Sequence, residues 1–335
     1  MRNILKQKWL KYFLFSIPQG VILTAILCAL SIPRQAEAGA ITLGTAANYG
    51  ILVGTGQTLA LNGSLSIAGD VGVGANGATQ SNGVNFISGT AYEDSGVYNG
   101  GIGYSFVSGG VVTASMSSAI SSAASASTAA GALTGTAGLV DQGGSISVSG
   151  GSVTIKALTN LSENVLNISS LSLLNGTMTF DDNGFTGAKF IINVTGAFSV
   201  NSSGALKSII QGINGATAAD ILFNIEGTGS TVSLTGNSTN QLIGTVLAPA
   251  RNVTIGGGGT LTGAIIAGVN NVGKSYTVSS GSGGYNITGF GYKPGTGSGT
   301  TKTPEPSSIL LFGTGLILLT TYRRYANRRS PKTRL

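Results

Sequence analysis

The sequence predicts a mainly β protein, built as a β-solenoid with one helix packed alongside it, and a β-sandwich is the alternative. Three observations predict this fold class: short segments of alternating polar and apolar residues, glycine or asparagine turns between these segments, and an internal repeat of about 20 residues. Both architectures use short strands at this spacing, so the spacing alone leaves the sandwich open.

The alternating segments are interpreted as two-period strands that end at glycine or asparagine. Richness in glycine and serine is also typical of flexible linkers, but a linker does not repeat apolar residues at every second position. The expected strands are 64–67, 145–148, 152–155, 198–200, 232–234 and 253–255.

The repeat is clearest toward the C-terminal end of the body. Residues 242–248 align with residues 261–267 at an offset of 19, and residues 232–234 align with residues 253–255 at an offset of 21. Short strands repeated with glycine corners are typical of solenoid coils. The glycine run 256–259 is interpreted as such a corner, because it lacks the lysine and the helix of a phosphate loop.

One segment, residues 115–133, breaks the β pattern. It is rich in alanine and serine, with no proline and no glycine before Gly131, and its apolar residues recur at helical spacing. These residues are Met116, Ala119, Ile120, Ala123, Ala126, Ala130 and Leu133. We expect one helix that packs along the β body by this small-residue face, with a low-complexity linker as the alternative.

The first 38 residues have the order of a secretory signal. Basic residues precede an apolar stretch that runs mostly from residue 12 to residue 32, and small residues follow at Ala36 and Ala38. We expect cleavage after Ala38, and a retained membrane anchor is the alternative. Cys28 has no small residues directly before it, so a lipid anchor is not expected.

The C-terminal segment, residues 303–335, has three parts in order. They are Pro304, Glu305 and Pro306, a short apolar membrane segment at 309–322, and a basic cluster that begins with Arg323 and Arg324. The apolar segment is short for a bilayer span, which needs about 20 residues, and the arginines would stay on the cytoplasmic side. This end resembles the PEP-CTERM sorting signal. The resemblance implies that an exosortase-like membrane enzyme processes the tail during export; a simple tail anchor is the alternative.

The positive net charge of +7 belongs to the two ends of the chain. Residues 39–302 hold seven of the 18 basic residues and nine of the 11 acidic ones, so the body carries 7 − 9 = −2. We therefore expect no nucleic-acid partner. Because the body has no cysteine, its stability must come from backbone ladders and apolar packing instead of disulfides.

The sequence offers little catalytic chemistry. There is no histidine, and the single cysteine lies in the expected signal, which excludes Ser-His-Asp and Cys-His catalysis and zinc sites with His or Cys ligands. The pairs Glu93-Asp94 and Asp181-Asp182 could support glycoside hydrolysis, but their glycine and asparagine contexts indicate turn carboxylates. A calcium loop at 181–184 lacks a known calcium-loop spacing. We predict no enzyme, no catalytic residue, no cofactor and no metal site.

Several aromatic residues could form a carbohydrate or protein contact surface, or could equally be half-buried strand residues. They are Tyr49, Tyr92, Tyr98, Tyr104, Phe106, Tyr285 and Tyr292.

Three segments resemble the choice-of-anchor A family of bacterial surface proteins: 190–196, 221–225, and 244–250 continuing to 263–267. The opening, residues 43–52, is also similar to the start of that family, so the resemblance covers most of residues 41–268. It implies an adhesin-like β-helical surface domain with alternative C-terminal anchors and no defined catalytic residues.

A weaker resemblance is to secreted bacterial ice-binding solenoids, which begin with a similar segment and place a helix beside a β-helix. Their binding faces favour flat arrays of threonine and similar small residues. In this sequence Thr-x-Thr occurs only in isolated places, such as 134–136 and 260–262.

Together these features predict a signal peptide (1–38), a β-solenoid body (39–281), a Gly/Ser/Thr linker (282–302) and the sorting segment (303–335). We expect an exported, non-enzymatic protein of a bacterial cell surface, outer envelope or biofilm matrix, attached transiently to the inner membrane through its C-terminal segment. Its expected activity is adhesin-like binding of polysaccharide or protein through a β-helical face. The alternatives are an ice-binding protein and a carboxylate-based glycan hydrolase.

Overall fold

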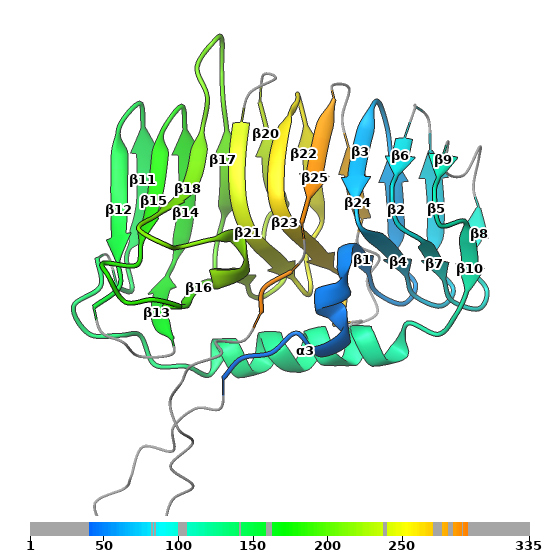
Figure 1. Ribbon diagram of the computed structural model, residues 1–335, viewed down its shortest axis with the longest axis horizontal. Coiled ribbons are helices and arrows are strands. Elements are labelled where there is room, and N and C mark those ends of the chain that lie inside the picture. The colour runs from blue at the N-terminus through cyan, green and yellow to red at the C-terminus, as the bar shows by residue number, and fades with distance from the viewer. Residues whose placement is uncertain are drawn as a thin grey trace, which may run out of the picture. The chain divides into compact units, whose positions relative to one another are not determined.

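The computed structural model describes residues 40–81, 83, 85–99, 106–140, 142–158, 163–236, 240–270, 277–280, 284–289 and 291–293. The expected signal and sorting segments lie outside this part of the chain. The described part is mainly β, as the sequence predicts, with one α-helix and two short 3₁₀ helices (Figure 1). The helices are α3 (Ser117–Gly131), η1 (Gly44–Asn48) and η2 (Ala218–Asp220).

The strands pair in parallel and are arranged on three faces, which we name the helix face, the serine face and the third face. The helix face, which α3 covers, contains in spatial order β10 (Val111–Thr113), β7 (Ala91–Glu93), β4 (Asp70–Val73), β1 (Tyr49–Val53), the second halves of β23 (Gly259–Ala267) and β21 (Asn240–Ala248), β19 (Ile221–Ile225), β16 (Phe190–Val194) and β13 (Asn164–Ile168).

The serine face is a separate sheet, with the order β8 (Tyr98–Asn99), β5 (Ala78–Ser81), β2 (Thr58–Leu61), β24 (Thr277–Ser280), β22 (Val253–Gly256), β20 (Val232–Thr235), β17 (Phe198–Asn201), β14 (Ser170–Leu174) and β11 (Ser145–Ser149). The third face contains β9 (Phe106–Val107), β6 (Asn85–Ile87), β3 (Leu65–Ala68), β25 (Tyr285–Thr288), the first halves of β23 and β21, β18 (Ile209–Ile213), β15 (Thr177–Asp181) and β12 (Ser152–Lys156). We call one passage of the chain over all three faces a coil; it consists of three strands, or of two where β21 or β23 covers two faces.

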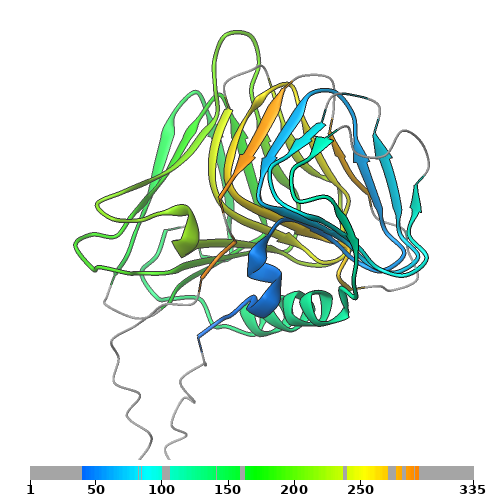
Figure 2. The same ribbon diagram turned by 45° about the vertical axis from the view of Figure 1, so that its right-hand side comes forward.

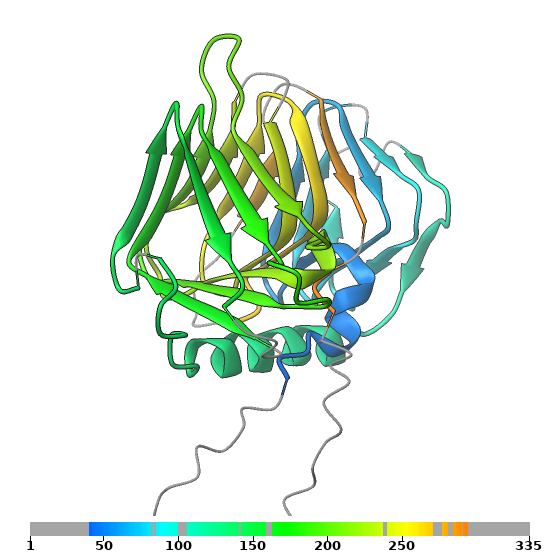
Figure 3. The ribbon, with the colours of Figure 1, turned by 60° about the vertical axis from the view of Figure 1, so that its left-hand side comes forward.

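The path of the chain brings its first and last described coils together. The strands β1 to β10 stack in one direction, α3 follows, and β11 to β25 stack back toward the start (Figure 1). We call the junction between these two coils the seam: there β1 pairs with β23, β2 with β24 and β3 with β25. Figure 2 shows the three-sided outline of the blue and cyan coils, and Figure 3 shows helix-face strands lying between α3 and the other two faces.

The predicted strands and the predicted repeat are both confirmed. Each expected strand overlaps an observed one, namely β3, β11, β12, β17, β20 or β22. Residues 242–248 pair one to one with residues 261–267, and residues 232–234 pair with residues 253–255, so the offsets of 19 and 21 are the lengths of one coil. The predicted glycine corner joins β22 to β23, and Gly257 has a φ of 76° with no room for a side chain beside the backbone of Gly236.

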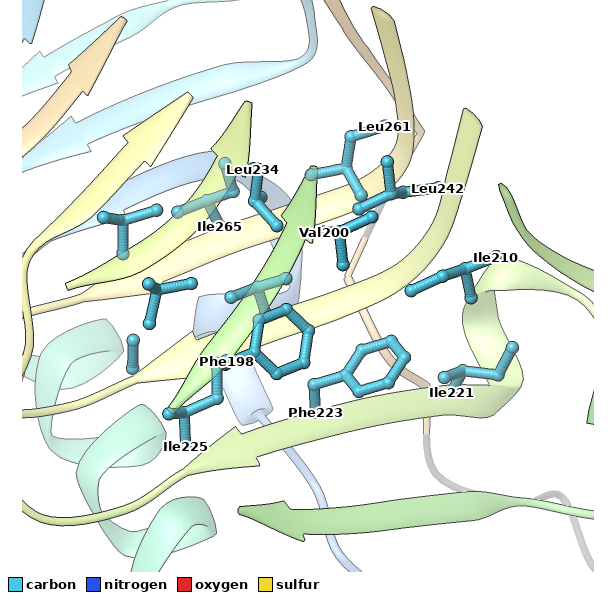
Figure 4. Close-up of a cluster of buried hydrophobic side chains, with 14 of the residues drawn as sticks. Phe198, Val200, Ile210, Ile221, Phe223, Ile225, Leu234, Leu242, Leu261 and Ile265 are labelled. Carbon is cyan, nitrogen blue, oxygen red and sulfur yellow. The ribbon is translucent and has the colours of Figure 1, made fainter. Parts of the chain in front are cut away.

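The interior of the coils is filled by inward-facing apolar residues from all three faces. Aromatic rings stack along the core: the ring centroid of Phe180 lies 5.1 Å from that of Phe190, and the centroid of Phe198 lies 5.3 Å from that of Phe223. Figure 4 shows Phe198 and Phe223 among leucine, isoleucine and valine side chains. Since the body has no disulfide, this burial and the backbone ladders must supply its stability.

The central strands of the helix face are buried on both sides, whereas β10 at its edge is exposed. Its outward-facing residues Leu52, Leu247 and Ile266 lie under α3, and β16 and β19 are buried at every position. The predicted small-residue face of the helix is confirmed: Met116, Ala119, Ala123, Ala126 and Ala130 are buried. Alanine at these positions lets the helix backbone approach the sheet closely.

An asparagine ladder fixes the C-terminal part of α3 to the sheet. Asn167, Asn193 and Asn224 are register neighbours on the helix face, and their side-chain amides are joined by hydrogen bonds of 2.9 Å. The amide of Asn193 also donates to the carbonyl of Ala130, and the amide of Asn224 donates to that of Ser127. The carbonyl of Ala130 also accepts from the N–H of Leu133 at 3.1 Å, so the ladder adds side-chain bonds that hold this end of the helix on the sheet.

Arg251 joins three successive coils at the corner between the helix face and the serine face. It is 1% exposed, and its guanidinium group donates to five backbone carbonyls. These belong to Thr195, Gly196, Glu226, Gly227 and Ser230, which follow β16 and β19. The fixed fork of five N–H donors suits this arrangement, and lysine could not reproduce it.

The predicted linker boundary at residue 282 is wrong. Strand β25 lies inside the predicted linker but pairs with β23 and β3, and Tyr285 is buried in the core. The chain remains part of the body as far as Lys293: Tyr292 is fully buried, and its N–H donates to Thr245 Oγ1 at 2.6 Å. Glycine and serine before β25 hid this strand, and one of its two partners, β3, is about 220 positions away in the sequence.

Replacement of Arg251 tests its role as a link between coils. We expect Arg251→Met to lower the free energy of unfolding by about 3 kcal/mol, because five carbonyls lose their donor in a buried corner. Thermal and urea unfolding of the full chain in mild detergent, followed by circular dichroism, measure this. The control Lys156→Met, at a side chain that is 59% exposed, should change stability by less than about 0.5 kcal/mol. Equal stability of the two variants would contradict the assignment.

Candidate ligand-binding faces

Two of the three faces are open to a ligand. Helix α3 covers the helix face, whereas the structure places no helix of the described residues over the serine face or the third face. Parallel strands lie about 4.8 Å apart, so side chains at one register position form a row with that spacing. Each open face therefore presents rows of side chains with a regular spacing to a ligand.

The serine face carries a row of small polar residues. One register position is occupied, from β11 to β2, by Ser147, Ser172, Ser199, Ser233, Thr254, Ser279 and Ala60. Ser147 is exposed, and the next four members are partly exposed. The sequence analysis found only isolated threonine pairs, because coils of unequal length place neighbouring members from Ser147 to Ser279 between 21 and 34 residues apart, and Ala60 joins the row from the other end of the body.

Hydrogen bonds between neighbouring side chains order part of this face. Ser199 Oγ donates to Ser172 Oγ at 3.2 Å. Ser233 Oγ and Thr235 Oγ1 both donate to Asn201 Oδ1, at 3.0 and 2.8 Å. The hydroxyl groups are thus held in fixed directions before any ligand binds, which lowers the entropic cost of binding.

The third face contains a shallow polar hollow of about 240 Å³ over the first residues of β21, β23 and β25. Its lining consists of Lys207, Asn240, Gln241, Gly259, Thr260, Gly284 and Asn286. No carboxylate lines the hollow, and Lys207 forms no ion pair with any residue in the described part of the chain. The hollow can therefore offer amide, hydroxyl and ammonium groups to a polar or anionic ligand.

Two of the aromatic residues that the sequence analysis singled out are buried in the core, and two others form a half-buried pair. Tyr285 and Tyr292 are buried, and Tyr49 packs edge-on against Tyr92 with ring centroids 5.9 Å apart. The side chains of Tyr98, Tyr104 and Phe106 lie outside the described set. Among the described side chains, Phe86 on β6 has an aromatic ring that is 44% exposed, and the sequence analysis missed it.

In each of the two acidic pairs, one aspartate accepts hydrogen bonds from nearby backbone or asparagine groups. Asp94 accepts hydrogen bonds from the N–H groups of Ser95 and Met116, at the start of α3. Asp181 accepts from Asn214 Nδ2 and from the N–H of Asn183, both at 2.8 Å. The bond from Asn214 is the main cause that lowers the pKa of Asp181. These contacts fit the interpretation as turn carboxylates.

A buried charged cluster lies where β15 leads toward β16. Lys189 Nζ donates to Asp220 Oδ1 at 2.5 Å and lies 5.8 Å from the ring centroid of Tyr292. Asp182 is 1% exposed, and burial, followed by repulsion from Asp220, raises its pKa to about 6 although Lys189 acts in the opposite direction. Among the described residues there is no group of three His, Cys, Asp or Glu side chains that could hold a metal ion.

The predicted targeting residues Ala36, Ala38, Pro304, Glu305, Pro306, Arg323 and Arg324 lie outside the described residues, as does the apolar segment 309–322. Within the described ranges, no helix is long and apolar enough to cross a membrane.

The family comparison identifies the class of protein. The family described as "Putative Ice-binding-like adhesive domain" matches residues 34–286, and the PEP-CTERM protein-sorting motif matches residues 302–329. The two matches define an exported bacterial surface protein whose sorting motif implies processing by an exosortase at the membrane. The chain belongs to the ice-binding-like adhesive domain family, and membership of this family suggests a non-enzymatic protein.

Several solved structures are similar to this chain. An ice-binding protein from the Antarctic ascomycete Antarctomyces psychrotrophicus is 18% identical, with 74% of this chain and 98% of that chain covered and a TM-score of 0.46. An ice-binding protein from an Arctic yeast is also 18% identical, with 76% of this chain and 96% of that chain covered and a TM-score of 0.45. A domain of ice-binding protein 1 from Shewanella frigidimarina is 16% identical, with 76% of this chain and 98% of that chain covered and a TM-score of 0.46. At these TM-scores the similarities carry no functional argument. A search of curated proteins finds no match.

The raised pKa of Asp182 predicts a pH-dependent stability. An aspartate in the unfolded chain ionises near pH 4, whereas Asp182 in the folded chain ionises near pH 6. Between these values the folded state keeps a proton that the unfolded state has lost, so the free energy of unfolding falls as the pH rises. We expect Asp182→Asn to remove this fall and to be more stable than the unmodified chain at neutral pH, as measured by urea unfolding across the range.

Asp181→Asn is the matched control, because the pKa of Asp181 is lowered. Its carboxylate contributes stability above the ordinary aspartate pKa and loses it in acid, so this variant should be less stable than the unmodified chain at neutral pH. Parallel pH profiles for Asp182→Asn and the unmodified chain would refute the assigned environment.

Proposed function

We propose that this protein is an adhesin-like component of a bacterial cell surface or extracellular matrix, which binds polysaccharide or protein through an open face of a β-solenoid. The observation that carries the proposal is the pair of open faces, the serine face and the third face, which hold polar side chains in register, whereas α3 already covers the helix face. A periodic array of weak contacts suits an extended, repetitive ligand, and many copies on one cell multiply its strength.

The same proposal includes the β-solenoid architecture, the choice-of-anchor A group and the processing of the two ends of the chain. The parallel pairing of the strands, which an antiparallel sandwich lacks, supports the β-solenoid. The motifs at 190–196 and 244–250 support membership of the choice-of-anchor A group. In this proposal the signal is cleaved after Ala38, the tail is processed at the motif 304–306 with Arg323 and Arg324 on the cytoplasmic side, and attachment to the inner membrane is transient.

The proposal assigns no catalytic role. Asp94 and Asp181 are engaged by backbone and asparagine donors, and Asp182 is buried, which weakens the hydrolase alternative. The family to which the chain belongs supports a binding function instead.

Surface display provides the test of the proposed function. We expect exosortase-bearing bacteria that display the full chain to adhere to polysaccharide-coated or matrix-protein-coated surfaces several times more than isogenic cells without it, because many weak contacts act together. Adhesion is measured as cells retained under flow. Equal retention with and without the displayed protein would exclude the adhesin function.

Ice binding is the second candidate, and the Ser/Thr/Ala row of the serine face is the observation that favours it. A flat row of small hydroxyl-bearing residues is the feature that this activity requires. If the row binds ice, the full chain slows ice recrystallisation and Ser233→Tyr, which places a bulky ring in the row, abolishes the effect. Absence of both thermal hysteresis and recrystallisation inhibition in the unmodified chain would remove this candidate.

A further inference from the structure

Three strands from different coils place polar side chains at one register position of the third face. Gln241 on β21, Thr260 on β23 and Asn286 on β25 are consecutive neighbours and line the polar hollow. Gln241 and Asn286 are exposed, and their side-chain amides form no hydrogen bond with another residue in the described part of the chain. Each amide can both donate and accept, so the row suits a ligand rich in hydroxyl groups.

The same row continues across the seam and ends at an aromatic ring. Asn286 pairs with Ser66 on β3, and Ser66 pairs with Phe86 on β6. Four steps of about 4.8 Å separate Gln241 from Phe86, which gives a track of about 19 Å. The row therefore combines hydrogen-bonding groups at one end with an exposed apolar ring at the other.

The register position beside this row holds mostly small side chains. Two residues further along the same strands, the outward positions are Ile243, Thr262, Thr288 and Ala68. Thr262 Oγ1 lies 3.4 Å from Thr288 Oγ1. The threonine and alanine side chains are small and leave room for a chain that lies across the strands.

The charge of the track selects among hydroxyl-rich ligands. Lys207 stands at its hollow end without an acidic partner among the described residues, and no carboxylate lines the hollow. An ammonium group in this setting attracts a carboxylate. An extended sugar chain meets all three features, since its hydroxyl groups match the amides, its C–H faces can pack on Phe86, and a uronic acid supplies the carboxylate.

We propose that the third face binds an acidic polysaccharide, whose chain lies across the coils from Lys207 to Phe86. The inference rests on the proposed adhesin function and adds to it the face, the contact residues and the class of ligand. Gln241 and Asn286 hydrogen-bond the sugar hydroxyl groups, Phe86 packs against one ring, and Lys207 pairs with a carboxylate. Salt should weaken the last contact, because it is solvent-exposed.

Calorimetric titration of the full chain in mild detergent tests the inference. The probes are a β-1,4-linked hexauronate and a neutral glucose hexasaccharide of the same linkage. We expect the hexauronate to bind more tightly, and Phe86→Ala and the double change Gln241→Ala/Asn286→Ala each to weaken it about tenfold. Lys207→Gln should weaken the hexauronate alone and should remove the preference over the neutral probe.

The matched control is Ser147→Ala/Thr254→Ala on the serine face, which should leave hexauronate binding unchanged. Far-ultraviolet circular dichroism checks that every variant retains its β structure. No hexauronate binding by the unmodified chain, equal binding of both probes, or unchanged binding in the third-face variants would overturn the inference.

The display assay separates failure of this inference from failure of the adhesin function. Loss of cell retention in the third-face variants supports the inference. If displaying cells are retained but the third-face variants are retained equally well, the inference is wrong and the adhesin function stands. Capture only by a protein-coated surface likewise overturns the polysaccharide assignment alone. If displaying cells are not retained at all, the proposed function itself fails.

Discussion

The parallel ladder between the first and the last described coils is the constraint on which the rest of the structure depends. Residues 51–53 of β1 pair with residues 265–267 of β23, more than 200 positions later in the sequence. This pairing, with those of β2 to β24 and β3 to β25, joins two stacks of coils that the chain builds separately. Without it each stack would end in an unpaired sheet edge, which is a site for aggregation.

The seam also explains why the helix face had to be closed by a helix. The chain must pass from one end of the stack to the other before β11 begins, and α3 makes part of that passage while it buries the outward apolar residues Leu52, Leu247 and Ile266. The asparagine ladder fixes the helix at one end. Covering one face leaves the serine face and the third face as the surfaces that a ligand can reach, and the third-face track crosses the seam itself.

Local patterns predicted much of the fold. Alternation located strands such as β11 and β22, the alanine stripe located α3, and the offsets of 19 and 21 gave the register of adjacent coils. Local patterns could not reveal that β25 pairs with β3, because the two strands are about 220 positions apart, and the Gly/Ser-rich approach to β25 was interpreted as a linker. The candidate sites were hidden for the same reason. Phe86, Gln241 and Asn286 come from distant parts of the sequence, and no spacing within one segment indicates that they share a row.

The central claim is that the first and last coils are direct neighbours, and a disulfide across the seam tests it most directly. Ser66 and Asn286 are outward register neighbours about 4.8 Å apart, within the range that a disulfide spans. In a Cys28→Ala background, Ser66→Cys/Asn286→Cys should form an intramolecular disulfide under mild oxidation and raise the unfolding temperature. The control Ser66→Cys/Thr260→Cys, two strands apart at about 10 Å, should not form one. No disulfide in the first pair, or equal formation in both, would contradict the account.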